Sequence, residues 1–88
     1  MSDAPWRVLY TSRARRDLRR LDRQVAKRVI LAIDGLAAND PRSDLRKLSA
    51  SDEYRLRVGE WRVRLDRDPT SREITVLRVL PRGRAYDR

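Results

Sequence analysis

An alternating run of residues near the middle of the chain is the feature that most restricts its fold. Residues 54–58 and 61–65 each alternate between apolar and basic side chains, and only Gly59 and Glu60 lie between them. Alternation with a period of two is typical of a β-strand with one buried and one exposed face. Two such runs separated by two residues, one of them glycine, indicate a β-hairpin with a type I′ or II′ turn.

The length of this turn determines which hairpin residues lie opposite one another. One face then carries the apolar residues Tyr54, Leu56, Val58, Trp61, Val63 and Leu65, and the other carries Arg55, Arg57, Arg62 and Arg64. Like charges opposite each other destabilise a sheet. The pattern therefore favours a surface that binds a polyanion, since guanidinium groups hold phosphate oxygens through two parallel hydrogen bonds. A solvated face, whose arginines only keep the sheet soluble, is the alternative.

The first half of the chain predicts a strand and two helices. Residues 6–10 read as a short strand, and the helical spacing that begins at Ala14 follows Thr11 and Ser12, either of which suits an N-cap. A second apolar stripe with a period of 3.6 covers residues 25–37, with Asp22 as its N-cap. This helix is expected to end at Asn39, which suits a left-handed C-terminal position.

The second half predicts the remaining strands. Residues 41–52 show no period and are expected to form a loop, and a turn over residues 66–72 leads to an apolar strand over residues 73–80. The predicted order is β-α-α-β-β-β, an α+β fold in which two N-terminal antiparallel helices pack on one face of a small antiparallel sheet. A chain of 88 residues has room for one such domain, covering residues 1–88.

The charge of the chain narrows the classes of partner. Lysine and arginine number 22 against 13 aspartate and glutamate, a net charge of +9, which favours nucleic acid. Only Lys27 and Lys47 are lysines. A GC-rich genome would produce such an arginine excess by codon bias, so the arrangement of the arginines has to carry the argument. The arginines at positions 13, 15, 16, 19 and 20 are interpreted as a solvated helix face or a partner surface.

The residue types that are missing exclude several classes of protein. The chain has no cysteine and no histidine, which excludes a disulfide framework, a zinc-finger-type site and histidine acid–base catalysis. It also has no signal-peptide pattern at its start and no run of about 20 apolar residues. The sequence therefore predicts a soluble, cytoplasmic protein without a metal, a cofactor or a membrane association.

Several segments resemble the RelE/ParE toxin superfamily, in particular its RelE-like branch. They are RDLRRL (16–21), NDPR (39–42), YRLRVGEWRV (54–63), VLRV (76–79), Arg82 and Tyr86, and together they cover nearly the whole chain. The resemblance implies the toxin of a type II toxin–antitoxin pair with a RelE-like fold. RelE-like members cut messenger RNA in the ribosomal A site, whereas ParE-like members poison DNA gyrase.

The resemblance also implies a set of site residues. Arg55 and Arg57 match the two basic strand residues of the family, Arg62 matches the hairpin arginine, and Arg82 and Tyr86 match the arginine and tyrosine of the tail. The chain departs from the pattern at Arg57, where a lysine is common, and at 80–81, where Leu-Pro replaces Gly-His. An arginine keeps its proton near neutral pH, so Arg57 is expected to stabilise charge and not to accept a proton.

These residues lead to a functional hypothesis: a ribosome-dependent, metal-independent endoribonuclease without a cofactor, in which the 2′-hydroxyl of the RNA attacks its own phosphate. The expected catalytic residues are Arg57, Arg62, Arg82 and Tyr86, and the expected RNA-binding residues are Arg55, Arg57 and Arg64. The expected partners are messenger RNA on the ribosome and a cognate antitoxin that covers the basic surface in a hetero-oligomer. A ParE-like gyrase inhibitor and a non-catalytic RNA-binding module are the alternatives.

Overall fold

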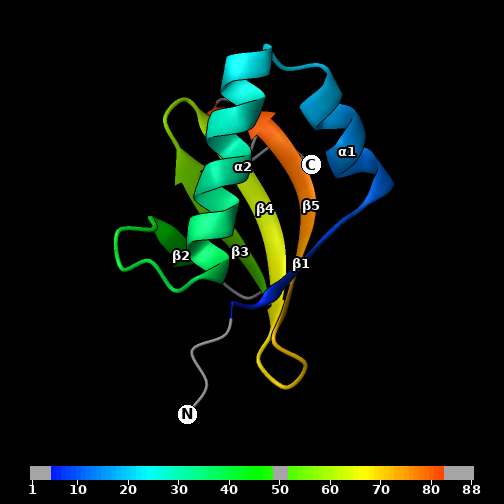
Figure 1. The fold of residues 1–88 in the computed structure, drawn as a ribbon. Helices are drawn as coiled ribbons and strands as arrows, with labels where there is room; N and C mark the ends of the chain where they lie inside the picture. Colours follow the sequence, from blue (N-terminus) through cyan, green and yellow to red (C-terminus); the bar gives the residue numbers. More distant parts are fainter. Residues whose placement is uncertain (1–4, 49–51, 83–88) are drawn as a thin grey trace.

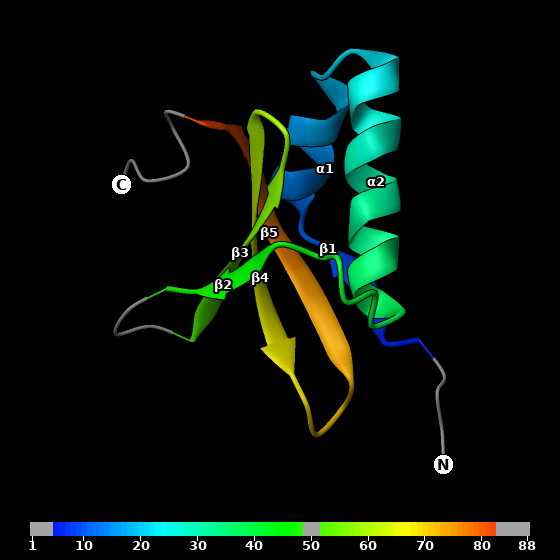
Figure 2. The same cartoon turned by 90° about the vertical axis from the view of Figure 1, so that its left-hand side faces the viewer.

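The computed structural model describes residues 5–48 and 52–82. Its helices and strands are β1 (Arg7–Tyr10), α1 (Ser12–Arg19), α2 (Arg23–Ala37), β2 (Leu45–Lys47), β3 (Glu53–Val58), β4 (Trp61–Asp68) and β5 (Glu73–Pro81). The strands form one five-stranded sheet in the order β1-β5-β4-β3-β2. Both helices pack on the same face of this sheet, which leaves its opposite face uncovered by helices (Figures 1 and 2). The predicted α+β architecture is confirmed.

Two parts of the sheet differ from the prediction. Residues Leu45–Lys47, expected to lie in a loop, form the edge strand β2 and pair with β3. Three residues are too few to show a period of two, so only the pairing reveals this strand. The sheet is also not wholly antiparallel, because β1 runs parallel to β5 at the opposite edge. A parallel pair needs a long crossover connection, and here both helices and three strands lie between the two partners.

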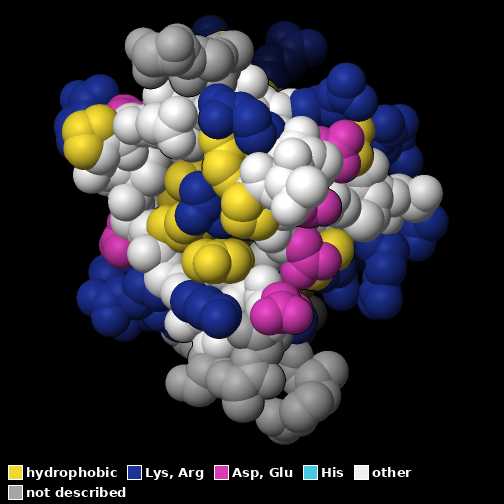
Figure 3. Space-filling view, turned by 90° about the horizontal axis from the view of Figure 1, so that it is seen from below, with side chains coloured by type: hydrophobic (Ala, Val, Ile, Leu, Met, Phe, Trp, Pro, Cys, Tyr) yellow, Lys and Arg dark blue, Asp and Glu magenta, His cyan; other side chains and the backbone are white. Residues whose placement is uncertain are grey.

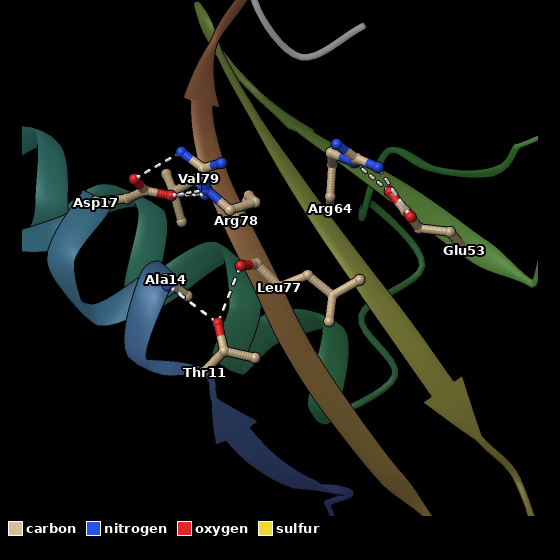
Figure 4. Close-up of polar contacts among 8 residues, drawn as sticks. All are labelled: Thr11, Ala14, Asp17, Glu53, Arg64, Leu77, Arg78 and Val79. Atoms are coloured by element: carbon tan, nitrogen blue, oxygen red, sulfur yellow. Dashed lines mark hydrogen bonds and ion pairs between the residues drawn. The ribbon is translucent and has the colours of Figure 1, made fainter. Parts of the chain in front are cut away.

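Thr11 caps α1 and also attaches it to the sheet. Its hydroxyl oxygen accepts a hydrogen bond from the backbone N–H of Ala14 at 3.0 Å, and the hydroxyl donates to the carbonyl oxygen of Leu77 in β5, also at 3.0 Å (Figure 4). Of the two candidate caps, Thr11 is therefore the one used. Because one side chain both starts the helix and contacts β5, the position of α1 on the sheet is determined at its first turn.

Helix α2 supplies the helical half of the core. Asp22 caps it by accepting the backbone N–H of Gln24 at 3.0 Å, as predicted, and the chain leaves the helix at Asn39, whose φ is 63°. The side chains at positions 29, 33, 36 and 37 are buried, which follows the predicted 3.6-residue period. The two described helices fall short of the length and apolarity that a bilayer-spanning segment requires.

The core lies between α2 and the helix-facing side of the sheet. Four of the six apolar hairpin residues, Leu56, Val58, Val63 and Leu65, are buried there, and Tyr54 and Trp61 pack against them partly exposed. This confirms the predicted division of the hairpin into two faces. Burying an aliphatic side chain stabilises a fold by about 1.5–3 kcal/mol. Burial of the apolar face therefore fixes the hairpin register, independently of the interactions that its arginines form.

Arg67 covers the end of the core next to the turn between β4 and β5. Its guanidinium carbon lies 4.7 Å from the centroid of the Trp6 ring and 5.4 Å from that of Tyr54. Figure 3 looks at this end of the molecule, where basic and hydrophobic side chains lie together and acidic side chains line one side. Such cation–π contacts contribute about 0.5–2 kcal/mol each. Arg67 thus stabilises the end of the sheet that is far from the hairpin turn.

Candidate functional site

The hairpin arginines occupy the sheet face that the helices leave uncovered. Arg57 pairs with Arg62 and Arg55 pairs with Arg64 across β3 and β4, as the two-residue turn predicts. Gly59, the first turn residue, has a φ of 59°, a left-handed conformation that favours glycine. The sequence pattern thus brings four arginines onto adjacent positions of two strands.

Arg62 is folded against the hairpin turn instead of projecting from the sheet. Its side chain donates through Nη1 to the carbonyl oxygens of Gly59 at 3.3 Å and Trp61 at 3.2 Å, and only 5% of the residue is exposed. Its buried Nε has no hydrogen-bond partner within the described residues. Arg62 is therefore a positively charged group held against the hairpin turn by two backbone carbonyl oxygens.

The charges of three other arginines act on Arg62. Burial lowers the pKa of the Arg62 guanidinium, and the positive charges of Arg57, Arg82 and Arg55 lower it further, while Glu60 acts in the opposite direction. Arg55, Arg57, Arg62 and Arg82 are called the arginine cluster below. Because arginine stays protonated near neutral pH, the cluster is a concentration of positive charge that an anion would stabilise.

Arg82 reaches the cluster from the end of β5. Its backbone N–H donates to the carbonyl oxygen of Glu60 at 2.8 Å, which attaches the end of β5 to the hairpin turn. Arg57 and Arg82 are both exposed, and neither forms an ion pair with a carboxylate of the described chain. Arg55 is partly buried and has an interaction of its own within the fold. The structure thus brings together four of the six predicted site residues.

Arg64 differs from the cluster because an acid neutralises it. Its Nε and Nη2 both bind the carboxylate of Glu53, with Nη2 3.0 Å from Oε1, and 30% of the Arg64 side chain is exposed (Figure 4). The hydrogen bond to Glu53 raises the pKa of Arg64. Its predicted contact with RNA would therefore compete with an ion pair inside the protein, and its role stays a prediction.

A second ion pair joins α1 to β5 and was not predicted. Asp17 binds Arg78 through two hydrogen bonds and also accepts the backbone N–H of Val79 at 2.9 Å (Figure 4). The sequence held a weak signal for it, because Asp17 is the single acid in a helix segment that is otherwise rich in arginine.

Two further predictions concern Tyr86 and metal ions. Tyr86 lies outside the described residues, so its role stays a prediction. Within residues 5–48 and 52–82, no group of three or more acidic, histidine or cysteine side chains is placed to hold a metal ion.

Comparison with known proteins places this arrangement in a family. Residues 8–86 match the family described as the ParE toxin of the type II toxin–antitoxin system, parDE. The chain belongs to the ParE toxin family. It is thus a toxin of the RelE/ParE superfamily, which confirms the resemblance seen in the sequence. A search of curated proteins gives no match.

Three of the solved structures similar to this ParE-family toxin come from complexes of RelE toxins. In the RelE–RelB complex of Pyrococcus horikoshii, the similar chain is 27% identical with a TM-score of 0.76, covering 93% of the present chain and 100% of the other. The RelBE2 complex of Mycobacterium tuberculosis gives 25% identity and a TM-score of 0.74, covering 90% and 100%. The RelB–RelE complex of Methanococcus jannaschii gives 26% and 0.72, covering 90% and 95%. The ParE-family toxin thus has a RelE-like fold.

Proposed function

We propose that this toxin is a ribosome-dependent, metal-independent endoribonuclease that cleaves messenger RNA, with the arginine cluster as its phosphate-binding site. The observation that carries the proposal is that Arg57, paired with the buried Arg62, and Arg82, attached to the hairpin turn, bring like charges together at one end of the hairpin. Folding alone does not favour like charges so close together. A phosphate group bound among them converts this repulsion into attraction, and the guanidinium groups match its oxygens.

The chemistry needs no group beyond the RNA and the protein. The 2′-oxygen of the RNA bonds to the neighbouring phosphorus while the bond from phosphorus to the 5′-oxygen breaks. The proton leaves the 2′-hydroxyl, and the departing 5′-oxygen takes up a proton. The products are a 2′,3′-cyclic phosphate and a 5′-hydroxyl. Negative charge builds up on the phosphate oxygens in the transition state, and positive groups already in place there lower its free energy.

Three members of the cluster, and Tyr86, have a proposed part in this reaction. Arg62, held by the carbonyl oxygens of Gly59 and Trp61 and only 5% exposed, is fixed before substrate arrives and would act on the phosphate through its charge. Arg57 and Arg82 are exposed, and they would contact the phosphate directly. Tyr86 is proposed to transfer a proton or to position the RNA, since an arginine does not accept one near neutral pH.

The proposed partners follow from the similar structures and from the charge. RelE toxins of similar fold were solved in complex with RelB. We therefore propose that a cognate antitoxin binds this toxin and covers part of its basic surface, in keeping with the net charge of +9. Messenger RNA on the ribosome is the proposed substrate, which would place the toxin in the cytoplasm.

One observation favours a second function. The family that matches this chain is described as the ParE toxin of the parDE system. A gyrase inhibitor would use the same basic surface only to bind its partner. In that case the arginine cluster would contribute to affinity and no RNA would be cut.

A reconstituted translation reaction separates the two functions. Purified toxin is added to ribosomes stalled on a messenger of known sequence, and primer extension locates any breaks, while the same preparation is tested for inhibition of DNA supercoiling by gyrase. We expect breaks within the ribosome-bound codons and normal supercoiling. Blocked supercoiling with an intact messenger would favour the gyrase inhibitor. The absence of both effects would favour a non-catalytic RNA-binding module.

A further inference from the structure

A row of arginines lies at paired positions across the sheet, next to the cluster. The sheet face that the helices leave uncovered is called the open face below. Arg46 of β2 pairs with Arg55 of β3, Arg55 pairs with Arg64 of β4, and Arg64 pairs with Arg78 of β5. Directly paired residues of neighbouring strands point to the same face, and the strands lie about 4.8 Å apart. These four residues are called the arginine row. Three successive like-charge pairs are therefore built into one line across four strands.

An acidic pair borders the arginine row on the side away from the hairpin turn. Glu53 of β3 pairs with Asp66 of β4, and both lie two residues farther from the hairpin turn than Arg55 and Arg64. Burial raises the pKa of Asp66, and the charges of Glu53 and Asp52 raise it further. Asp66 forms no ion pair with a described basic side chain, so its negative charge is not offset at this level of the sheet. This charge disfavours a polyanion that extends from the arginine cluster along the strands, and favours one that crosses them.

The two halves of the arginine row differ in charge balance. On β4, Arg64 forms an ion pair with Glu53, and on β5, Arg78 forms one with Asp17. On β2, Arg46 is exposed and forms no ion pair with a described carboxylate. Arg57, on the neighbouring strand β3, is also exposed and also forms no ion pair with a described carboxylate. Arg46 on β2, next to Arg57 on β3, is therefore a part of the uncovered sheet face whose positive charge no described carboxylate offsets.

We propose that single-stranded RNA leaves the arginine cluster across β3 toward β2, and that Arg46 binds a backbone phosphate outside the cleavage position. This inference rests on the proposed function, since it takes RNA as the ligand of the cluster. Arg46 is a positioning residue in this account. It holds the RNA by charge and leaves the reacting phosphate to the cluster.

Lys47 offers a matched control for Arg46. It is the next residue of β2, it is also exposed and cationic, and it pairs with Tyr54, on the helix-facing side of the sheet. Charged residues on a short edge strand also protect a sheet against pairing with other chains. Such a protective role would involve the charge of Lys47 as much as that of Arg46, whereas RNA binding on the open face involves Arg46 alone.

The experiment measures binding of a short single-stranded RNA whose 2′-hydroxyls are methylated, so that it binds but is not cut. Fluorescence anisotropy is recorded over a series of salt concentrations for the wild type, Arg46→Ala and Lys47→Ala. We expect Arg46→Ala to weaken binding about five- to tenfold. The slope of the logarithm of the binding constant against the logarithm of the salt concentration should become shallower by about 0.7, the value for one phosphate contact on a single strand. Lys47→Ala should bind as the wild type does.

A cleavage assay on ribosome-bound messenger adds a second readout. Arg46→Ala should raise KM and leave kcat unchanged, because Arg46 acts on binding and not on the transition state. Wild-type affinity in Arg46→Ala, an equal loss in Lys47→Ala, or no RNA binding by the wild type would each overturn the inference. RNA binding that depends on Arg46 without any cleavage would instead overturn the proposed function and keep the RNA path. Thermal melting confirms that each variant is folded.

Discussion

Asp17 of α1 holds Arg78 of β5 through two hydrogen bonds, Nε to Oδ2 at 2.8 Å and Nη2 to Oδ1 at 3.2 Å. The same carboxylate accepts the backbone N–H of Val79. Strand β1 pairs with β5 only as far as Val76, so beyond that residue Asp17 replaces a neighbouring strand as the acceptor for β5. Because β5 leads to Arg82, this link between helix and sheet also positions one member of the arginine cluster.

Replacing Asp17 should destabilise the fold strongly. Asp17→Ala leaves Arg78, whose side chain is 28% exposed, without its partner, and leaves the backbone N–H of Val79 without an acceptor. We expect the free energy of unfolding to fall by about 2–3 kcal/mol, measured by urea denaturation. Asp34→Ala removes an exposed acid from α2 and should change the free energy of unfolding by less than about 0.5 kcal/mol. Equal losses in both variants would contradict the role of Asp17.

The same carboxyl should make stability depend on acid. Burial by itself would raise the pKa of Asp17, but the hydrogen bonds from Arg78 and Val79 and the charges of Arg78 and Arg20 hold it below its ordinary value. A carboxyl whose pKa is lowered by folding stabilises the fold above its unfolded pKa of about 3.9 and loses that contribution as the pH falls through the folded value. The stability difference between the wild type and Asp17→Asn should therefore shrink between pH 7 and pH 2. A constant difference would argue against this ion pair.

Asp66 should show the opposite sign. Burial and the charges of Glu53 and Asp52 raise its pKa, so ionisation of Asp66 destabilises the fold as the pH rises through that range. Asp66→Asn removes this charge. We expect it to raise the melting temperature at pH 7 and to have no effect at pH 2, where the wild-type carboxyl is protonated. A lower melting temperature at pH 7 would show that the charged form is stabilised instead.

Glu53 should restrain RNA binding by neutralising Arg64. Glu53→Gln removes the negative charge and weakens the hold on the Arg64 guanidinium, so RNA affinity should rise severalfold. Arg64→Ala provides the comparison, because it removes the same ion pair together with the cation. Its affinity should not exceed that of the wild type. If Glu53→Gln binds RNA no better than the wild type, the charge of Arg64 contributes nothing to RNA binding.

Features that depend on neighbouring residues were predictable from the sequence. The turn at Gly59 determines the pairing of Arg57 with Arg62, because a two-residue connection allows one register. Asp22 and Asn39 mark the ends of α2 through side-chain and backbone preferences that act within a few residues. Local chemistry is enough for such features.

Features that depend on distant residues were not predictable in this way. Strand β2 exists because Leu45–Lys47 meets β3, and the bond between Asp17 and Arg78 joins positions 61 residues apart. Alternation places Arg62 on the open face, but it does not determine the conformation of a long side chain. The fold turns Arg62 back onto the carbonyl oxygens of Gly59 and Trp61.

The single-turnover rate of cleavage of ribosome-bound messenger tests the central claim most directly. Arg57→Ala and Arg82→Ala each remove an exposed member of the arginine cluster, and Arg15→Ala removes an exposed arginine from α1 as a control for total charge. We predict that each cluster variant slows cleavage by about 10²- to 10³-fold, while Arg15→Ala stays within about twofold of the wild type. Wild-type rates in both cluster variants would contradict the proposal that these guanidinium groups stabilise the scissile phosphate.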